Sequence, residues 1–178
     1  ELIFEDCEVP AENLIGREGT GFIWAMKTFD VSRPGIAAQA IGLAQGALDE
    51  AVAYAKVREQ FGRPIIANQG LSWMLAEMAT KVETARALTY ATVKTIDSGA
   101  KDISKFSAMC KMYASDIAMQ VATDAVQVFG GYGYMKEYPV EKMMRDAKIL
   151  QIYEGTNQIQ RDIIGLALNK EYGAVAKK

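Results

Sequence analysis

The 178-residue chain is half hydrophobic, carries a net charge of −2 and contains no histidine. This composition excludes Ser/His/Asp and Cys/His sites, histidine-based zinc sites and a histidine pH switch, so proton transfer must use a carboxylate, lysine, tyrosine or cysteine. The 20 basic and 22 acidic residues are interspersed, which provides no basic surface for nucleic acid. No apolar segment approaches the roughly 20 residues of a membrane span, and two cysteines are too few for a disulfide framework, which favours a reduced, cytoplasmic protein.

The first predicted element is a short strand over residues 2–9, where apolar residues alternate loosely with acidic ones until Pro10. A glycine-containing loop over residues 13–21 then leads to a helix that begins near Thr20. The chain starts at Glu1 rather than at a methionine, which we interpret as a sign that it is a piece of a longer protein.

Three long amphipathic patterns follow, with apolar residues three and four positions apart. They cover residues 22–54, 71–96 and 106–128. Pro34 should kink or restart the first helix. Asn68 and Asp102 are the expected N-caps of the second and third helices, and Gly130-Gly131 should end the third.

Two shorter helices complete the predicted fold. Pro139 occupies a first helical position, giving a helix that ends near Lys148, and a last helix follows Thr156. Long antiparallel helices joined by short loops form a bundle. The predicted fold is therefore all-α, an up-and-down four-helix bundle with extra C-terminal helices, preceded by a short N-terminal strand segment.

The loop over residues 151–158 is the first candidate for chemistry. Glu154 has apolar and aromatic neighbours, which would partly desolvate its carboxylate and make it a better base near neutral pH, and Gly155 leaves room for a substrate. Free backbone N–H groups at residues 156–158 suit an anion or ring heteroatoms. The spacing alone favours an ordinary capping or surface glutamate.

Four further segments depart from plain amphipathic patterning, and each also has an ordinary structural interpretation. Residues 58–64 are a helix exit with cations at the negative dipole end, or an arginine fork for a phosphate. The glycine-rich exit over residues 127–133 lacks G-x-G-x-x-G after a strand, so it is a C-cap or a close approach to a ligand. Asp30 and Arg33 form by default a surface ion pair, and residues 138–146 have the alternating charges of a solvated helix face.

Taken together and in this order, the segments resemble the C-terminal portion of the flavin-dependent acyl-CoA dehydrogenases, over residues 1–172. The motifs that carry the resemblance are Phe29-Asp30…Arg33, Arg58…Phe61-Gly62, Asn68-Gln69, Gln127…Gly130-Gly131, Tyr138-Pro139-Val140-Glu141 and Tyr153-Glu154-Gly155-Thr156…Gln158-Ile159-Gln160-Arg161. The resemblance implies that residues 1–19 are the end of the family's middle β domain and its connecting loop. Residues 20–178 would then be the C-terminal helical-bundle domain.

The resemblance also implies a reaction, the α,β-dehydrogenation of a saturated acyl-CoA thioester to the trans-2-enoyl-CoA. Glu154 matches the glutamate that removes the α-proton while a hydride leaves the β-carbon for FAD. Ser32 stands where some members place this base, and a serine cannot replace it. One carboxylate and one flavin suit a chain without histidine.

Specific contacts follow from the same resemblance. The residues expected to hold the adenosine and pyrophosphate of a neighbouring subunit's FAD are Arg58, Phe61 and Gln69. A second wall of that site is expected from Gln127, Gly130 and Gly131. The helix start expected to meet the flavin of the same subunit is Thr156, Asn157 and Gln158. The CoA moiety is expected against Phe29, Asp30 and Arg33, with Tyr153 and Gly155 beside the thioester.

The implied partners are acyl-CoA, an electron-transfer flavoprotein and further copies of the chain, as a tetramer built from two dimers. Neither nucleic acid, a membrane nor a metal is expected, and the implied location is the bacterial cytoplasm or the mitochondrial matrix. One departure is Asn68, where many members have histidine.

Two other functions stay open. A family member can serve other flavin chemistry, such as enoyl-CoA reduction or decarboxylating oxidation. The chain alone can also be an oligomerisation module without activity, because the family's N-terminal helical domain and most of its β domain are absent from this sequence. We expect the isolated chain to be folded, oligomeric and colourless.

Overall fold

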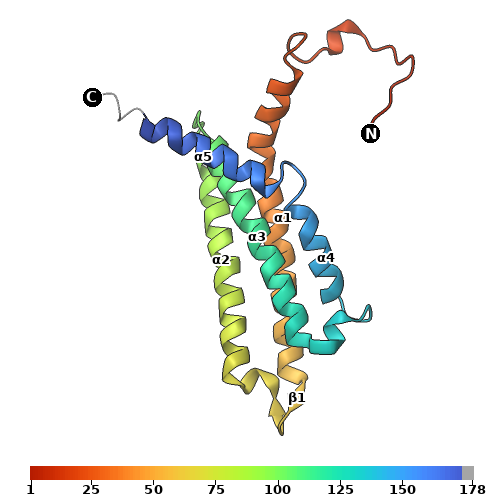
Figure 1. The fold of residues 1–178 in the computed structure, drawn as a ribbon, viewed down its shortest axis with the longest axis vertical. Helices are drawn as coiled ribbons and strands as arrows, with labels where there is room; N and C mark the ends of the chain where they lie inside the picture. Colours follow the sequence, from red (N-terminus) through yellow and green to blue (C-terminus); the bar gives the residue numbers. More distant parts are fainter. Residues whose placement is uncertain (174–178) are drawn as a thin grey trace.

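The computed structural model describes residues 1–173 and is predominantly helical (Figure 1). Its helices are α1 (Gly21–Val57), α2 (Gln69–Asp97), α3 (Ser104–Phe129), α4 (Val140–Leu150) and α5 (Asn157–Gly173). The smaller elements are 3-10 turns over Ala11–Asn13, Ile65–Ala67 and Gly130–Tyr134, and the antiparallel strands β1 (Glu59–Gln60) and β2 (Arg63–Pro64). The last five residues of the predicted domain 20–178 lie outside the described residues.

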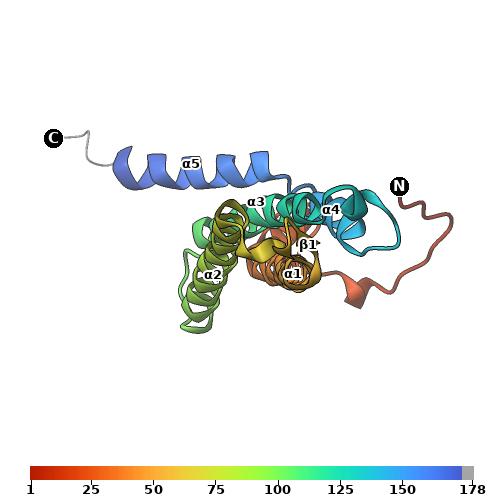
Figure 2. The ribbon, with the colours of Figure 1, turned by 90° about the horizontal axis from the view of Figure 1, so that it is seen from below.

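The first four helices run alternately up and down, and α3 contacts α1, α2, α4 and α5 (Figure 1). Seen from below, α5 lies across the outside of α3 and extends beyond the bundle (Figure 2). The predicted all-α bundle with an additional C-terminal helix is therefore confirmed. No helix in the part that the structure describes is long and apolar enough to cross a membrane.

Small side chains form the centre of the bundle. The fully buried residues of α1 include Ala37, Ala40, Ala44, Ala47, Ala51 and Ala55, and those of α3 include Ala118, Ala122 and Ala125. Their three- and four-residue spacing places each set on one helix face. Because alanine side chains are small, α1 and α3 can pack closely along their length. Larger residues of α2, such as Met78 and Val82, fill the space between α2 and this pair of helices.

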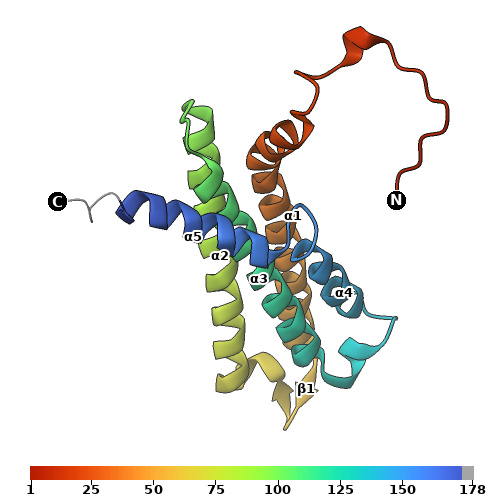
Figure 3. The ribbon, with the colours of Figure 1, turned by 45° about the horizontal axis from the view of Figure 1, so that its top comes forward.

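The predicted strand over residues 2–9 is wrong for this chain. These residues form no ladder, and the N-terminal segment extends away from the bundle with its apolar side chains exposed (Figure 3). A strand needs a neighbour for its backbone N–H and C=O groups, and β1 and β2 pair only with each other. The assignment of residues 1–19 to a preceding β domain stays a prediction.

The structure also bears on two expectations about helix boundaries. Of the kink or restart expected at Pro34, the restart is excluded, because α1 continues through this residue. Proline cannot donate to the carbonyl four residues earlier, and that carbonyl, on Asp30, instead accepts a hydrogen bond of 2.5 Å from the Ser107 hydroxyl of α3. Asp102 is not the N-cap of α3, since Ile103 has that position; Asn68 does precede α2 as predicted.

The two cysteines should differ sharply in reactivity. Cys7 is exposed, whereas Cys110 is buried in the core, and burial raises the pKa of its thiol to about 11. Since the thiolate is the reactive form, we expect a disulfide reagent at pH 8 to label one thiol in the folded chain and two in denaturant. Cys7→Ser should remove the fast-reacting thiol, and rapid labelling of a second thiol without denaturant would contradict the packing of α3.

Candidate active site

Glu154 lies in the tight turn between α4 and α5, and the turn packs against the N-terminal half of α1. Its Oε2 accepts a hydrogen bond of 2.8 Å from the Ser32 hydroxyl of α1. Glu154 and Gly155 both have left-handed backbone angles, with φ of 52° and 89°. For a residue with a side chain this conformation costs about 1–2 kcal/mol, so the surrounding contacts must hold the turn in place.

Arg33 is one of the residues that hold the turn. Its side chain is almost fully buried, with its Nε 3.4 Å from the Glu154 carbonyl oxygen and its Nη1 3.1 Å from Asp30 Oδ1. Burial lowers the pKa of Arg33, while the charges of Asp30 and Glu154 oppose this shift. The interpretation of Asp30 and Arg33 as a surface ion pair is therefore wrong, because the fold places the arginine inside, beneath the candidate base.

Sequence reasoning missed two further contacts to the turn, both with fully buried side chains. Lys111 Nζ donates to the Gly155 carbonyl at 2.9 Å, and Gln160 Nε2 donates to the same carbonyl at 3.0 Å. A signal for Lys111 exists in the sequence. It lies four residues after Ser107 and seven before Ala118, on the face of α3 that otherwise carries small buried residues.

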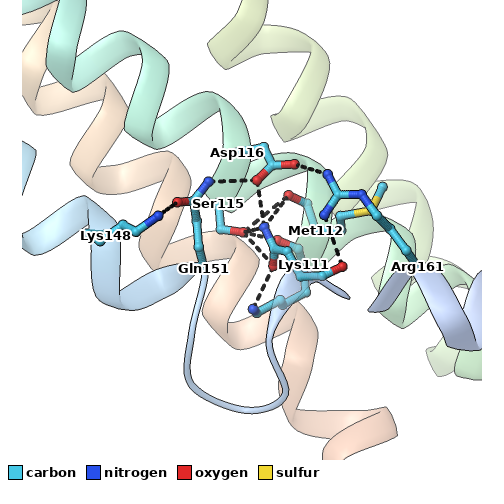
Figure 4. A network of polar contacts seen from close by, with 8 residues as sticks. Lys111, Met112, Ser115, Asp116, Lys148, Gln151 and Arg161 are labelled. Atoms are coloured by element: carbon cyan, nitrogen blue, oxygen red, sulfur yellow. Dashed lines mark hydrogen bonds and ion pairs between the residues drawn. The ribbon is translucent and has the colours of Figure 1, made fainter. Parts of the chain in front are cut away.

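A polar network joins residues of α3 to Gln151 and Arg161 (Figure 4), and the first residue of α5, Asn157, takes part in it. Its Nδ2 donates to Ser115 Oγ and Asp116 Oδ1, and Asp116 also binds Gln151 and Arg161. Its backbone N–H bonds to the Gln151 carbonyl. The cofactor contact expected for Asn157 stays a prediction, but its side chain is already bonded to α3 and its N–H to the Gln151 carbonyl at the start of the turn.

The other predicted neighbours of Glu154 surround the same turn. The Tyr153 hydroxyl donates to Gln39 Oε1 of α1, and burial together with the Glu154 charge raises the pKa of Tyr153. The Arg33 guanidinium lies 5.8 Å from the centre of the Phe29 ring. Thr156 and Gln158 line a shallow pocket at the start of α5. The structure thus brings Phe29, Asp30, Arg33, Tyr153, Gly155, Thr156 and Gln158 to one end of the bundle with Glu154.

The remaining predicted cofactor residues lie at the opposite end, around the β1–β2 hairpin (Figure 1). Arg58, Gly130 and Gly131 share the lining of a hollow of about 570 Å³. The Arg58 guanidinium lies 5.7 Å from the Tyr132 ring centre in that hollow. Phe61 and Gly62 form the left-handed tip of the hairpin, and Phe61 is 93% exposed. Gln69 and Gln127 are exposed near this end but do not line the hollow.

Comparison with known proteins decides the family. The family model described as "Acyl-CoA dehydrogenase, C-terminal domain" matches residues 19–168. The chain belongs to the acyl-CoA dehydrogenase family. Members of this family are flavoprotein oxidoreductases, and within residues 1–173 no group of three or more cysteine and acidic side chains could hold a metal ion.

Among its relatives, the acyl-CoA dehydrogenase of Bacillus subtilis (strain 168) is 58% identical over 164 residues, which are 92% of this chain and 43% of that protein. The acryloyl-CoA reductase (NADH) of Anaerotignum propionicum is 53% identical over 170 residues, 96% of this chain and 43% of that protein. The butyryl-CoA dehydrogenase structure from Megasphaera elsdenii has a TM-score of 0.90 at 51% identity, over 93% of this chain and 43% of that one. The chain thus spans less than half the length of these acyl-CoA dehydrogenase relatives.

Proposed function

We propose that the complete protein containing this chain oxidises a saturated acyl-CoA to the trans-2-enoyl-CoA, with Glu154 as the base that removes the α-proton. The proposal rests on the local environment of the Glu154 carboxylate. It accepts a hydrogen bond from the neutral Ser32 hydroxyl and, within the described residues, has no ion pair, because the Arg33 guanidinium binds Asp30 and a backbone carbonyl instead. A carboxylate that is oriented but not neutralised can take a proton at its second oxygen.

The two hydrogen atoms leave the substrate in different forms. The α-proton passes to a Glu154 carboxylate oxygen, and FAD, when bound, supplies the acceptor for the hydride that leaves the β-carbon. The turn and Ser32 keep the carboxylate in one orientation. Tyr153 and Gly155 are assigned to the border of the thioester. A Cβ on Gly155 would lie 2.7 Å from Gln160 Nε2, so the glycine is needed for packing within the turn rather than for substrate space, which corrects the expectation drawn from the sequence.

The hollow at the hairpin end fits the phosphate-bearing part of FAD. Arg58 supplies a cation for a phosphate, and a Cβ built on Gly130 or Gly131 would meet no atom within 4 Å, so the backbone there is open to a ligand. We therefore assign Arg58, Gly130 and Gly131 to the pyrophosphate and adenosine region. The exposed side chains of Phe61, Gln69 and Gln127 extend this surface.

Thr156 and Gln158 are assigned to a flavin at the other end of the bundle, beside Glu154. Since the hairpin hollow and the Glu154 turn lie at opposite ends (Figure 1), one copy of the chain would contribute to two separate flavins. This arrangement supports a homo-oligomer in which the hairpin end completes a neighbour's FAD site, and we propose a tetramer made of two dimers.

The CoA part of the substrate is assigned to Phe29 and Asp30, with Arg33 beneath them. The Asp30 carboxylate already receives Arg33 Nη1 and the Ser104 hydroxyl. This pairing fixes the N-terminal half of α1 against α3 and would orient the groups that meet the ligand. An electron-transfer flavoprotein is the proposed acceptor of the electrons, in the cytoplasm of a bacterium or the mitochondrial matrix.

Anaerobic mixing of the complete flavoenzyme with saturated acyl-CoA thioesters of graded length tests this function. At least one thioester should bleach the oxidised flavin and yield the trans-2-enoyl-CoA, as identified by mass and by comparison with authentic product. The 53%-identical relative named as an NADH-dependent acryloyl-CoA reductase supports enoyl-CoA reduction as the second candidate. Bleaching by NADH but by no saturated thioester would favour that reaction and contradict the proposed one.

A further inference from the structure

Lys111 is a charged residue in the interior of the bundle, and neither the proposed base nor the cofactor contacts include it. Its side chain is 0% exposed. The Nζ donates to the Gly155 carbonyl at 2.9 Å and to Asn157 Oδ1 at 2.8 Å. Lys111 therefore joins α3 to the last residues of the Glu154 turn and to the first residue of α5.

The position of Lys111 matches the unusual backbone of the turn. The two consecutive left-handed residues, Glu154 and Gly155, direct their carbonyl oxygens into the protein, where buried donors receive them. Arg33 and Gln160 share the Glu154 carbonyl, while Lys111 and Gln160 share the Gly155 carbonyl. Of these donors, Lys111 alone comes from α3 and also binds Asn157, so it fastens the C-terminal end of the turn and the start of α5 to α3.

We expect the chain to fold without a charge at this position. Without Lys111, the Gly155 carbonyl would keep Gln160 Nε2 at 3.0 Å. A buried ammonium is costly to desolvate, and an apolar side chain of similar volume is often no less stable. A role in positioning explains the presence of a lysine better than a role in stability.

We propose that Lys111 is a positioning residue of the active site, whose ammonium holds the Glu154–Gly155 turn in the conformation that presents the Glu154 carboxylate to the substrate. This inference rests on the proposed function of Glu154. Lys111 acts through the turn and does not touch the reacting atoms. Its removal should therefore lower the rate of proton abstraction more than the affinity for acyl-CoA.

The charges around Lys111 also predict a pH dependence. Burial, followed by the nearby Arg33, lowers the pKa of Lys111 to about 8, while Asp116 and Glu154 raise it. Arg161 on α5 is paired with Asp116 and faces the same network. Above pH 8 the ammonium loses its proton, its bond to the Gly155 carbonyl weakens, and the turn loosens. The wild-type rate of flavin reduction should therefore fall over this range.

The test is Lys111→Met in the complete flavoenzyme, with Lys142→Met, an exposed lysine of α4, as the matched control. We expect the limiting rate of flavin reduction to fall about 10- to 100-fold, with little change in KM, flavin content or thermal midpoint. The part of the alkaline decline that begins near pH 8 should disappear. Lys111→Gln, which keeps a shorter neutral donor, should recover part of the rate and serves as the second variant if Lys111→Met does not fold.

Three outcomes would overturn the inference. They are a wild-type rate in Lys111→Met, an unchanged alkaline decline in that variant, or a lower thermal midpoint with an unchanged limiting rate, the last of which indicates a structural role. Glu154→Gln measured in parallel separates the two claims. If it retains the wild-type rate, the proposed function fails; if it loses the rate while Lys111→Met keeps it, only the inference about Lys111 fails.

Discussion

Replacing Glu154 by glutamine in the complete flavoenzyme should lower the rate of flavin reduction by saturated acyl-CoA by about 10²- to 10⁴-fold, the usual contribution of a general base. The substitution preserves the shape of the side chain. The new amide oxygen can still accept the hydrogen bond from Ser32, which the carboxylate receives at 2.8 Å. Only the capacity to take a proton is lost, so binding of acyl-CoA should change far less than the rate.

Stopped-flow measurement of flavin bleaching under anaerobic conditions provides the readout, and binding of the substrate to the oxidised enzyme is measured separately. Glu83→Gln, at an exposed position on α2, controls for loss of a carboxylate elsewhere. Ser32→Ala gives an intermediate case, because it keeps the base and removes its orienting hydrogen bond. A bleaching rate in Glu154→Gln equal to that of Glu83→Gln would exclude Glu154 as the base.

Gly155→Ala should be the most damaging addition of a single methyl group to the turn. A Cβ at this position would lie 2.7 Å from Gln160 Nε2, and the φ of 89° is one that residues with side chains rarely adopt. The strain costs about 1–3 kcal/mol. Gln160 must move, which disturbs its bonds to the Glu154 and Gly155 carbonyls. We expect lower stability and a rate of flavin reduction reduced at least about 10-fold.

Gly165→Ala is the matched control for this substitution. Gly165 lies within α5, and a Cβ there would meet no atom within 4 Å. Alanine is the better helix former by about 1 kcal/mol, so this variant should be as stable as the wild type or more so. Denaturant titration and flavin bleaching of both variants check the prediction, and equal behaviour of the two would show that the turn tolerates a side chain.

The helices could be predicted from the sequence because their signals are local. Apolar residues three and four positions apart mark the buried face of each helix, and Gly130, Pro139 and the polar residues around Asn68 mark ends that the structure places within a few residues. Local signals could not decide whether residues 2–9 form a strand, because a strand needs a neighbouring strand for its backbone hydrogen bonds. The continuation of α1 through Pro34 depends on Ser107 of α3, which replaces the missing backbone donor.

The candidate site, like the fold, could be predicted from the sequence only in part. The order of its motifs along the chain was sufficient to indicate the family, the candidate base Glu154 and the two glycine-rich helix ends. The burial of Arg33, the inward direction of Asn157 and the contacts of Lys111 and Gln160 with the turn are properties of the packed bundle. Lys111 is 44 residues from Gly155 in sequence, a separation over which no local pattern specifies contact.

By itself, the sequence of this protein determined the helical class, the approximate helix ends, the lack of histidine in this chain and the family. Only the tertiary structure decided which polar side chains are buried together and which backbone carbonyls they hold. The physical reason is that periodicity reports which face of a helix avoids water, whereas a hydrogen bond between α3 and the Glu154 turn depends on the rotation and approach of two helices that meet only in the folded chain.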